Sequence, residues 1–530
     1  MKNIAFYGSH NGGFAFKHDG RYRVLEVERF ANKKNLGMVQ YRLCRNAKTV
    51  FDGIMSYLKT EFNLDNDYDN CIFSNTDVVY GTDNGLEKFY FERYINAKNH
   101  IPCLHHRAHA AGTFYQSPFT EALIISFDGG GSDGFFNIYT ATREGGVIEI
   151  ARHNIDMGYA YMIFGHYCSH INFESDINIG NLVYSGKLMG LCGYGKVRNE
   201  WLPHIKEFYY KKPDGNIIEG YLKDLGTKLG ITFDSSNRFE GDISLDLSTT
   251  SQQAFEEVFF EIIEPYLDHF KNLPICITGG CALNVVLNTK LKEKTGRDVF
   301  VAPNSNDCGL ALGMLLDFEK PLEQVDVTYG GLPPIDPNAF FELIESKWTD
   351  PYTLEKAAKL LAEGRIIGTI WGNSEHGPRA LGNRSIMCNP SIPGMKDILN
   401  EKVKKREWFR PFAPIVRLED VEKYFYWKGE SRFMSFYAKV KDEWKEKLSA
   451  ITHVDGTARL QTVTREQNEK VYDLITEFEK HSGIGVLLNT SFNVNGKPLI
   501  NSYKDALKML DCGLDFVYTD KYIVYNSDNK

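Results

Sequence analysis

Residues 275–318 read ICITGGCALNVVLNTKLKEKTGRDVFVAPNSNDCGLALGMLLDF, and this stretch decides the fold class. The apolar run Ile275–Thr278 predicts a strand, and the apolar spacing over Ala282–Lys292 predicts a helix after it. A second strand, Val299–Ala302, and a second helix, Cys308–Phe318, repeat the order. Because short strands alternating with helices are typical of α/β proteins, we expect an α/β fold.

The same reasoning extends to both sides of this stretch. The predicted strands are Asn3–Tyr7, Gly13–Lys17, Arg21–Glu28, Ala122–Phe127, Phe135–Thr140, Val147–Arg152, Arg365–Trp371 and Gly485–Asn489, and the predicted helices are Ser251–Lys271 and Leu354–Glu363. Residues 330–337, GGLPPIDP, form the densest Gly/Pro segment and predict a domain boundary. We find no internal repeat.

Length and composition limit the class of protein. The 530 residues carry 61 Lys+Arg against 69 Asp+Glu, a net charge of −8, so we expect several globular domains and no general affinity for polyanions. The N-terminus lacks the apolar segment of a signal peptide, and no stretch approaches the ~18 apolar residues of a membrane helix. The ten cysteines contain no Cys-x-x-Cys pair. We therefore expect reduced thiols, a cytoplasmic location and no membrane partner.

Two nucleotide motifs are matched only formally. Gly129–Gly134 fits G-x-G-x-x-G, but an alternating strand pattern follows it, whereas a dinucleotide-binding loop must open a helix. Gly186-Lys187 resembles the end of a P-loop, but Leu188 stands where Ser or Thr is needed. We reject both interpretations.

A possible metal site combines two histidines and two aspartates. His105 and His109 are four residues apart and would share one face of a helix, although such a pair alone is more often structural. Asp128 ends one predicted strand and Asp307 follows another, and Asp307 alone could equally cap a helix. Two imidazoles and two carboxylates suit an octahedral ion such as iron or manganese better than tetrahedral zinc.

Other segments could bind anions. Gly279-Gly280 forms a strand-to-helix turn before Asn284, which suits a phosphate or ring but also fits a tight corner. Three basic blocks follow, at residues 375–384, 402–410 and 455–459. Their arginines stand beside glycine, proline and aromatic residues, and converging guanidinium groups hold phosphate through paired hydrogen bonds. The lysine-rich part of the second block could instead be a solvated helix face.

Taken together, these segments resemble the O-carbamoyltransferases that act on nodulation factors, cephalosporins and tobramycin. The resemblance covers nearly the whole chain in order, at residues 7–10, 28–34, 105–110, 186–191, 279–284, 307–313, the three basic blocks and 488–493. It implies an N-terminal actin/hexokinase-like ATPase (ASKHA) domain over residues 1–345 and a YrdC-like α/β domain over 346–530. It also implies a transferase that makes carbamoyl-adenylate from ATP and carbamoyl phosphate and then carbamoylates a hydroxyl.

The resemblance assigns roles to individual residues. His105, His109, Asp128 and Asp307 correspond to the ligands of Fe²⁺ or another divalent ion, with Mg²⁺ as a further possible cofactor. His10 and Lys34 correspond to catalytic groups near the acceptor or the carbamoyl group. The carbamoyl-phosphate site corresponds to Arg379, Lys404, Arg410 and Arg459, and the nucleotide site to Lys187, Gly279, Gly280, Asn284 and Asn489.

Some alternatives stay open at this point. The acceptor is a small-molecule, sugar or nucleotide hydroxyl, or alternatively a hydroxymethylated base in nucleic acid. A tRNA threonylcarbamoyl transferase-like enzyme and a non-enzymatic ATP-sensing module are further alternatives, and the oligomeric state is monomer or homodimer. The chain departs from the family at four positions. An acidic residue is frequent where this chain has Ser132, Ser185 and Asn389, and a basic residue is frequent where it has Asn495. These departures leave the acceptor and the fine geometry of the site open.

Overall fold

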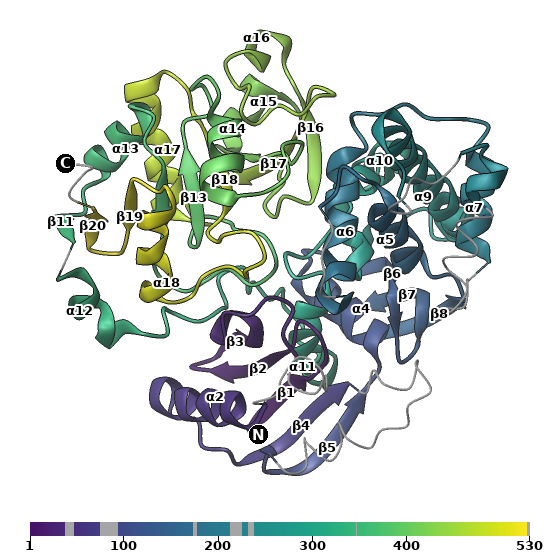
Figure 1. The fold of residues 1–530 in the computed structure, drawn as a ribbon. Helices are drawn as coiled ribbons and strands as arrows, with labels where there is room; N and C mark the ends of the chain where they lie inside the picture. Colours follow the sequence, from purple (N-terminus) through teal and green to yellow (C-terminus); the bar gives the residue numbers. More distant parts are fainter. Residues whose placement is uncertain are drawn as a thin grey trace.

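The structure is a computed structural model that describes residues 1–37, 47–74, 94–172, 177–211, 225–231, 238–345 and 347–526. It is a mixed α/β protein with two five-stranded sheets in the first half and one ten-stranded sheet in the second (Figure 1). The α/β class expected from residues 275–318 is therefore confirmed.

The first sheet has the strand order β3-β2-β1-β4-β5. Its strands are β1 (Asn3–Tyr7), β2 (Gly13–His18), β3 (Arg21–Glu26), β4 (Tyr68–Ser74) and β5 (Ala97–Cys103). The predicted strands Gly13–Lys17 and Arg21–Glu28 form a hairpin around Asp19-Gly20, with β1, β2 and β3 antiparallel and β4 and β5 parallel to β1. The strand predicted to reach Glu28 is too long, because the short helix α1 (Val27–Phe30) begins after Glu26.

The second sheet repeats this topology, with the order β8-β7-β6-β9-β10. Its strands are β6 (Glu121–Gly131), β7 (Gly134–Thr142), β8 (Gly146–His153), β9 (Ile275–Thr278) and β10 (Val299–Phe300). Again three antiparallel strands are followed by two parallel ones. The duplication has no visible trace in the sequence, because many different side chains satisfy the same pattern of strand burial.

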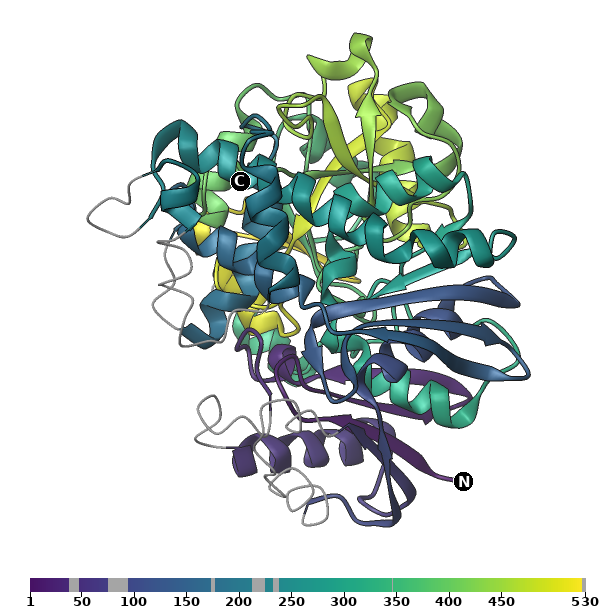
Figure 2. The ribbon, with the colours of Figure 1, turned by 90° about the vertical axis from the view of Figure 1, so that its right-hand side faces the viewer.

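Two helices lie between these sheets, α4 (His105–Gln116) and α11 (Leu310–Glu319) (Figure 2). They pack in one core with residues from both sheets, such as Ala5 and Ile124. The two helices approach closely, since a Cβ on Gly313 would lie 2.0 Å from the carbonyl oxygen of Ala108. This contact brings His109 on α4 close to Asp307, which lies in the short turn before α11.

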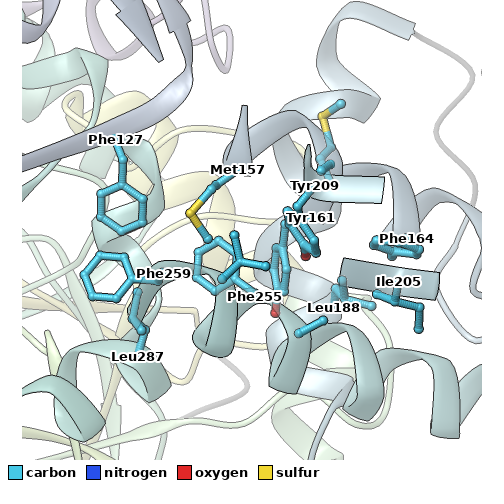
Figure 3. Close-up of a cluster of buried hydrophobic side chains, with 14 of the residues drawn as sticks. Phe127, Met157, Tyr161, Phe164, Leu188, Ile205, Tyr209, Phe255, Phe259 and Leu287 are labelled. Carbon is cyan, nitrogen blue, oxygen red and sulfur yellow. The ribbon is translucent and has the colours of Figure 1, made fainter. Parts of the chain in front are cut away.

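The outer faces of both sheets are covered by helices. The first is covered by α2 (Ala47–Phe62), and the second by α5 (Met157–Tyr167), α6 (Ile177–Leu191), α7 (Leu202–Tyr210) and α9 (Gly241–His269). Figure 3 shows part of the second core, where Leu188 of α6 lies near Phe164 and Ile205. Helix α9 begins ten residues before the predicted start at Ser251. The apolar pattern did not predict its first turns, because buried polar side chains such as Ser244 and Ser248 occupy them.

The predicted helix Ala282–Lys292 is divided. A short 3₁₀ helix, η2 (Gly280–Leu283), precedes α10 (Val285–Thr295), and the Asn284 side chain accepts a hydrogen bond from the Leu287 N–H to cap α10. A second 3₁₀ turn, η3 (Asp307–Gly309), precedes α11.

The second half is built on the order β11-β20-β19-β12-β13-β18-β14-β17-β16-β15. Its strands are β11 (Trp348–Pro351), β12 (Ile367–Thr369), β13 (Ser385–Cys388), β14 (Ala413–Arg417), β15 (Phe425–Tyr426), β16 (Phe436–Val440), β17 (Thr457–Val463), β18 (Val486–Ser491), β19 (Phe516–Tyr518) and β20 (Tyr522–Tyr525). Its helices are α12 (Phe340–Ile344), α13 (Leu354–Ala362), α14 (Met395–Ile398), α15 (Val421–Tyr424), α16 (Asp442–Lys445), α17 (Glu469–Ser482) and α18 (Tyr503–Lys508), with the short turns η4 (Pro337–Ala339), η5 (Leu399–Lys404), η6 (Leu418–Asp420) and η7 (Met509–Cys512).

The change from one half to the other falls near the predicted boundary. Leu332 packs in the core of the first sheet, whereas Phe340 already packs in the core of the ten-stranded sheet. The division between residues 345 and 346 itself stays a prediction. In the described ranges, no helix is both long enough and apolar enough to cross a membrane.

Candidate functional site

The four side chains predicted to bind metal meet between the two five-stranded sheets. His105, His109, Asp128 and Asp307 each offer one ligand atom, and these atoms all lie within 4.8 Å of one another. His109 Nε2 is 3.3 Å from Asp307 Oδ1 and 3.4 Å from Asp128 Oδ2, and His105 Nε2 is 3.8 Å from Asp307 Oδ1. We call these four residues the His–Asp cluster.

The turn between β6 and β7, Ser132-Asp133, holds the start of the histidine-bearing helix in place. Helix α4 begins at His105, and the Asp133 carboxylate accepts hydrogen bonds from the backbone N–H groups of His106 (2.8 Å) and Arg107 (3.2 Å). Ser132 Oγ accepts one from the N–H of His105 (3.2 Å). These bonds satisfy donors that a helix N-terminus leaves free, so the serine at position 132 has a structural role of its own.

Asp128 is fixed by backbone N–H groups. Its Oδ2 accepts a hydrogen bond from the N–H of Gly280 and its Oδ1 from that of Gly129, both at 2.7 Å. Gly279 has φ 91°, and a Cβ there would lie 2.1 Å from the Phe127 carbonyl oxygen. The glycine pair thus forms the tight corner that keeps Asp128 in position.

Asp307 is oriented by Tyr7 and His10. The Tyr7 hydroxyl donates to Asp307 Oδ2 at 2.7 Å, and His10 Nε2 lies 3.3 Å from the same oxygen. No helix-capping bond forms from this side chain, because Asn306 occupies the N-cap position of η3. The alternative that Asp307 is a helix cap is therefore wrong.

The cluster fits a divalent cation. Both ring nitrogens of His105 are buried without a hydrogen-bond partner in the described part of the chain, and a bound cation would supply a partner for Nε2, the nitrogen that faces Asp307. Burial lowers the pKa of His105, which favours the neutral imidazole that binds metals. Burial also opposes the charge on His109, but the Asp128 and Asp307 carboxylates outweigh it and raise its pKa to about 9, so this site attracts positive charge.

His10 connects this cluster to a second polar chain. Its Nδ1 lies 3.2 Å from Asn11 Oδ1, and Asn11 Nδ2 donates to Glu28 Oε2 at 3.3 Å. Burial lowers the pKa of the Lys34 amine, and Glu28 is close enough to offset part of this lowering. The His10 side chain is 31% exposed, so a substrate can reach it.

Seven cationic side chains gather between the two halves of the protein. This basic cluster consists of Lys34 and Lys187 from the first half and Arg379, Lys404, Arg406, Arg410 and Arg459 from the second. Burial lowers the pKa of Lys34 to about 8, assisted by Arg410, Lys187 and Arg379. The pKa of Arg459 falls for the same reasons, with Arg379 and Arg410 as its charged neighbours. Mutual repulsion of this kind indicates an anion site.

The four cations predicted to bind carbamoyl phosphate (Arg379, Lys404, Arg410 and Arg459) differ in their surroundings. The Lys404 ammonium donates to Ser491 O (2.5 Å), Asn493 O (2.8 Å) and Asn493 Oδ1 (2.6 Å), so its three protons already have acceptors. Lys404 therefore contributes charge and position. Arg459 Nε, in contrast, is buried without a hydrogen-bond partner among the residues the structure describes.

Two further members of the site were not singled out from the sequence. Arg406 donates to Asn400 Oδ1 at 2.8 Å and stacks 4.5 Å above the Phe412 ring, beside Arg410 and Arg459. Glu407 pairs with Lys187 at 2.9 Å and with Arg410 at 3.5 Å. The dense charge of residues 402–410 was a signal for both, but Lys187, which pairs with Glu407, and Arg459, which lies near Arg406, are distant in the sequence.

The residues expected to bind nucleotide do not form one group. Lys187 belongs to the basic cluster, and Gly279 and Gly280 hold Asp128. Asn284 Nδ2 donates to Gln252 Oε1 at 3.0 Å, and Asn489 Nδ2 donates to Gln461 Oε1 at 2.7 Å. The nucleotide role of these residues stays a prediction.

The remaining family departures lie in ordinary polar surroundings. Asn389 Oδ1 accepts a hydrogen bond from the Ser391 N–H at 2.9 Å, and the Asn495 N–H donates to the Lys404 carbonyl oxygen at 3.3 Å. Ser185 lies on α6, two residues before Lys187.

Comparison with known proteins gives a consistent picture. A carbamoyltransferase N-terminus model matches residues 14–316, and a carbamoyltransferase C-terminus model matches residues 358–526. Nodulation protein NolNO of Sinorhizobium fredii is 33% identical over 451 residues, which are 79% of this chain and 63% of that protein. The 3'-hydroxymethylcephem-O-carbamoyltransferase of Streptomyces clavuligerus is 37% identical over 342 residues, 61% of each chain. The matched part thus spans less than two thirds of either relative.

Likeness to solved structures is slight. Full-length HypF in its phosphate- and nucleotide-bound form gives a TM-score of 0.36 at 14% identity, covering 60% of this chain and 46% of that one.

Proposed function

The chain belongs to the carbamoyltransferase family, and we propose that it is an ATP-dependent O-carbamoyltransferase that works through carbamoyl-adenylate. The observation that carries this proposal is the basic cluster, in which two lysines of the first half join five cations of the second. Glu407 pairs with Lys187 and Arg410, and an anionic ligand would offset the charges that remain. A series of polar contacts, from Lys34 through Glu28, Asn11 and His10, connects the basic cluster to the His–Asp cluster.

We also assign each half a fold type. The repeated order of three antiparallel and two parallel strands, with α4 and α11 between the sheets, supports an actin/hexokinase-like (ASKHA) ATPase domain in the first half. The second half would be the YrdC-like domain that handles carbamoyl phosphate. ATP would contact both halves, because the basic cluster draws on both.

The first step would form carbamoyl-adenylate. Water attacks the phosphorus of carbamoyl phosphate, the anhydride bond from phosphorus to the carbamoyl oxygen breaks, and inorganic phosphate and carbamate form. A carbamate oxygen then attacks the α-phosphorus of ATP, the bond to the β-phosphate oxygen breaks, and pyrophosphate leaves. Arg379, Arg410 and Arg459 would hold the anions in position, because converging guanidinium groups bind phosphate oxygens in pairs. Burial keeps the unstable carbamate away from bulk water.

The second step would transfer the carbamoyl group. The acceptor oxygen attacks the carbamoyl carbon, the bond to the adenylate oxygen breaks, and AMP leaves. His10 is the candidate base for the hydroxyl proton. Its two ring nitrogens face Asp307 and Asn11, so the acceptor hydroxyl would replace one of these contacts.

The His–Asp cluster would hold Fe²⁺ or another divalent cation. Its two nitrogens and two carboxylates match the ligands of such ions. When bound, the cation supplies a fixed positive charge near the reacting oxygens. Tyr7 and Gly280 would keep the carboxylates oriented through their hydrogen bonds to Asp307 and Asp128.

The decisive experiment supplies ATP, carbamoyl phosphate and Fe²⁺ together with a panel of hydroxyl acceptors. The panel includes sugars, nucleosides and DNA that contains a hydroxymethylated base. We expect AMP and a product about 43 Da heavier than the acceptor. The variant His10→Ala should still form the adenylate but not the product, whereas Arg459→Met should form neither. Absence of AMP under every condition would overturn the proposal.

A further inference from the structure

A short segment of the second half, residues 375–377, is enclosed by the first half. Arg29 donates to the Glu375 carbonyl oxygen at 2.5 Å, the His376 N–H donates to the Thr328 carbonyl oxygen at 2.8 Å, and the Gly377 N–H donates to Glu26 Oε1 at 3.1 Å. A Cβ on Gly377 would lie 2.1 Å from the Pro303 carbonyl oxygen. These contacts fix residues 375–377 against Pro303, in the loop that leads to Asp307.

The His376 side chain is fully buried and bonded at both ring nitrogens. Its Nδ1 lies 2.7 Å from Asn304 Nδ2, and its Nε2 lies 2.9 Å from the Cys308 carbonyl oxygen. Since Asn304 Nδ2 can only donate and a carbonyl can only accept, the imidazole is neutral with its proton on Nε2. Each hydrogen-bonding group of the ring is thus satisfied in one orientation.

The orientation of Asn304 is fixed as well. Its Oδ1 accepts a hydrogen bond from Gln116 Nε2 at 2.9 Å, and the same nitrogen donates to the Gly112 carbonyl oxygen at 2.7 Å. Gln116 and Gly112 both belong to α4, the helix that carries His105 and His109. The three side chains form a buried chain of hydrogen bonds from α4 through Asn304 to His376.

The other end of this chain is next to Asp307. Cys308, whose carbonyl oxygen accepts from His376, directly follows Asp307, and both belong to the turn η3. His376 therefore ties the turn that carries one carboxylate of the His–Asp cluster to the helix that carries its imidazoles. The ring makes no contact with the four cluster residues themselves.

We infer that His376 is a positioning residue for the His–Asp cluster, supplied by the half of the protein that does not contain that cluster. It holds the Asp307 turn at the correct distance from α4. Arg379 of the basic cluster follows three residues later, so one inserted segment fixes both sites relative to each other. The inference rests on the proposal that the cluster holds a divalent cation.

The test measures Mn²⁺ binding to the full chain, by calorimetry and by the loss of the free-ion electron paramagnetic resonance signal. His376→Leu removes both hydrogen bonds, whereas His376→Gln keeps a donor for the Cys308 carbonyl. His153→Leu is the control, because His153 is bonded to Tyr266 on the outer side of the second sheet. Carbamoyl phosphate binding is measured on the same samples to report the integrity of the basic cluster.

We expect Mn²⁺ affinity to fall about 10- to 100-fold in His376→Leu, as for other residues that orient metal ligands. His376→Gln should recover most of it, and His153→Leu should match the unaltered protein.

Equal affinity in all four proteins would overturn this inference while leaving the metal site intact. If the unaltered chain itself bound no Mn²⁺, the metal proposal would fail, and this inference with it. Simultaneous loss of Mn²⁺ and carbamoyl phosphate binding in both His376 variants would indicate a purely structural role and would also overturn it.

Discussion

Lys187 Nζ lies 2.9 Å from Glu407 Oε1, and the two side chains are only 3% and 2% exposed. Lys187 comes from α6 in the first half, and Glu407 from the basic segment of the second half. Burial opposes the charge on Glu407, but the hydrogen bonds to this carboxyl and the charges of Lys187 and Arg410 together outweigh burial and lower its pKa. This ion pair therefore joins the halves at the place where the proposed anionic substrates bind.

Breaking this pair from one side should destabilise the protein strongly. Lys187→Met leaves a buried carboxylate with Arg410 as a charged partner only at 3.5 Å, so we expect a loss of about 3–5 kcal/mol in the free energy of unfolding. The double variant Lys187→Met, Glu407→Gln should lose less than the sum of the single changes. Urea titrations measure these values. The control is Lys206→Met, whose partners Glu257 and Glu261 are partly exposed, and it should change stability by at most ~1 kcal/mol. Additive effects of the two single changes would contradict a direct interaction.

Gly131→Ala should damage the His–Asp cluster. A Cβ at this position would lie 2.4 Å from the His105 ring, which is buried and has no room to move away. We expect Mn²⁺ affinity to fall at least tenfold, because ligand orientation controls metal affinity. Gly186→Ala is the matched control, since nothing lies within 4 Å of its added methyl group and alanine favours the helix α6. Unchanged affinity in Gly131→Ala would argue that His105 is not a ligand.

Arg459→Met should weaken binding of carbamoyl phosphate. A hydrogen bond to a charged group contributes about 1.5–3 kcal/mol, so the Kd measured by calorimetry should rise roughly 10- to 150-fold. Arg465→Met is the comparison, because Arg465 is exposed and pairs with Asp473. If both variants bound carbamoyl phosphate as the unaltered protein does, the basic cluster would not be the site.

Anion binding should depend on pH through Lys34. The pKa of this amine is lowered to about 8, mainly by burial, so it loses its charge as pH rises through that value. A neutral amine attracts an anion less, and sulfate affinity should therefore fall about tenfold above pH 8. Sulfate is a suitable probe because its own charge is constant in this range. The pH dependence should flatten in Lys34→Met, and an equally steep dependence in that variant would assign the titration to another group.

Local patterns predicted the strands well where burial alternates regularly. Strands β1 and β9 occur at their predicted bounds, because apolar runs between turn residues suffice to define them. The start of α9 was missed, since Ser244, Asp246 and Ser248 are buried there without an apolar period. The split at Asn284 follows from a capping bond that a periodicity analysis does not detect.

The two sites differ in how far the sequence could predict them. The His–Asp cluster was expected because His105 and His109 are four residues apart, Asp128 ends one predicted strand and Asp307 follows another. The basic cluster was seen only in part, because its members from the first half, Lys34 and Lys187, reach it through packing between the halves. Glu407 and His376 depend on contacts with Lys187 and Cys308, which are 220 and 68 positions away, and local spacing along the chain does not encode such contacts.

The most direct test of the account is pyrophosphate exchange into ATP. The protein is incubated with ATP, labelled pyrophosphate and carbamoyl phosphate, and label in ATP reports the reversible formation of carbamoyl-adenylate. We expect label to enter ATP only when carbamoyl phosphate is present, and Arg459→Met to abolish the exchange. Exchange that does not require carbamoyl phosphate, or none with active protein, would contradict the adenylate mechanism.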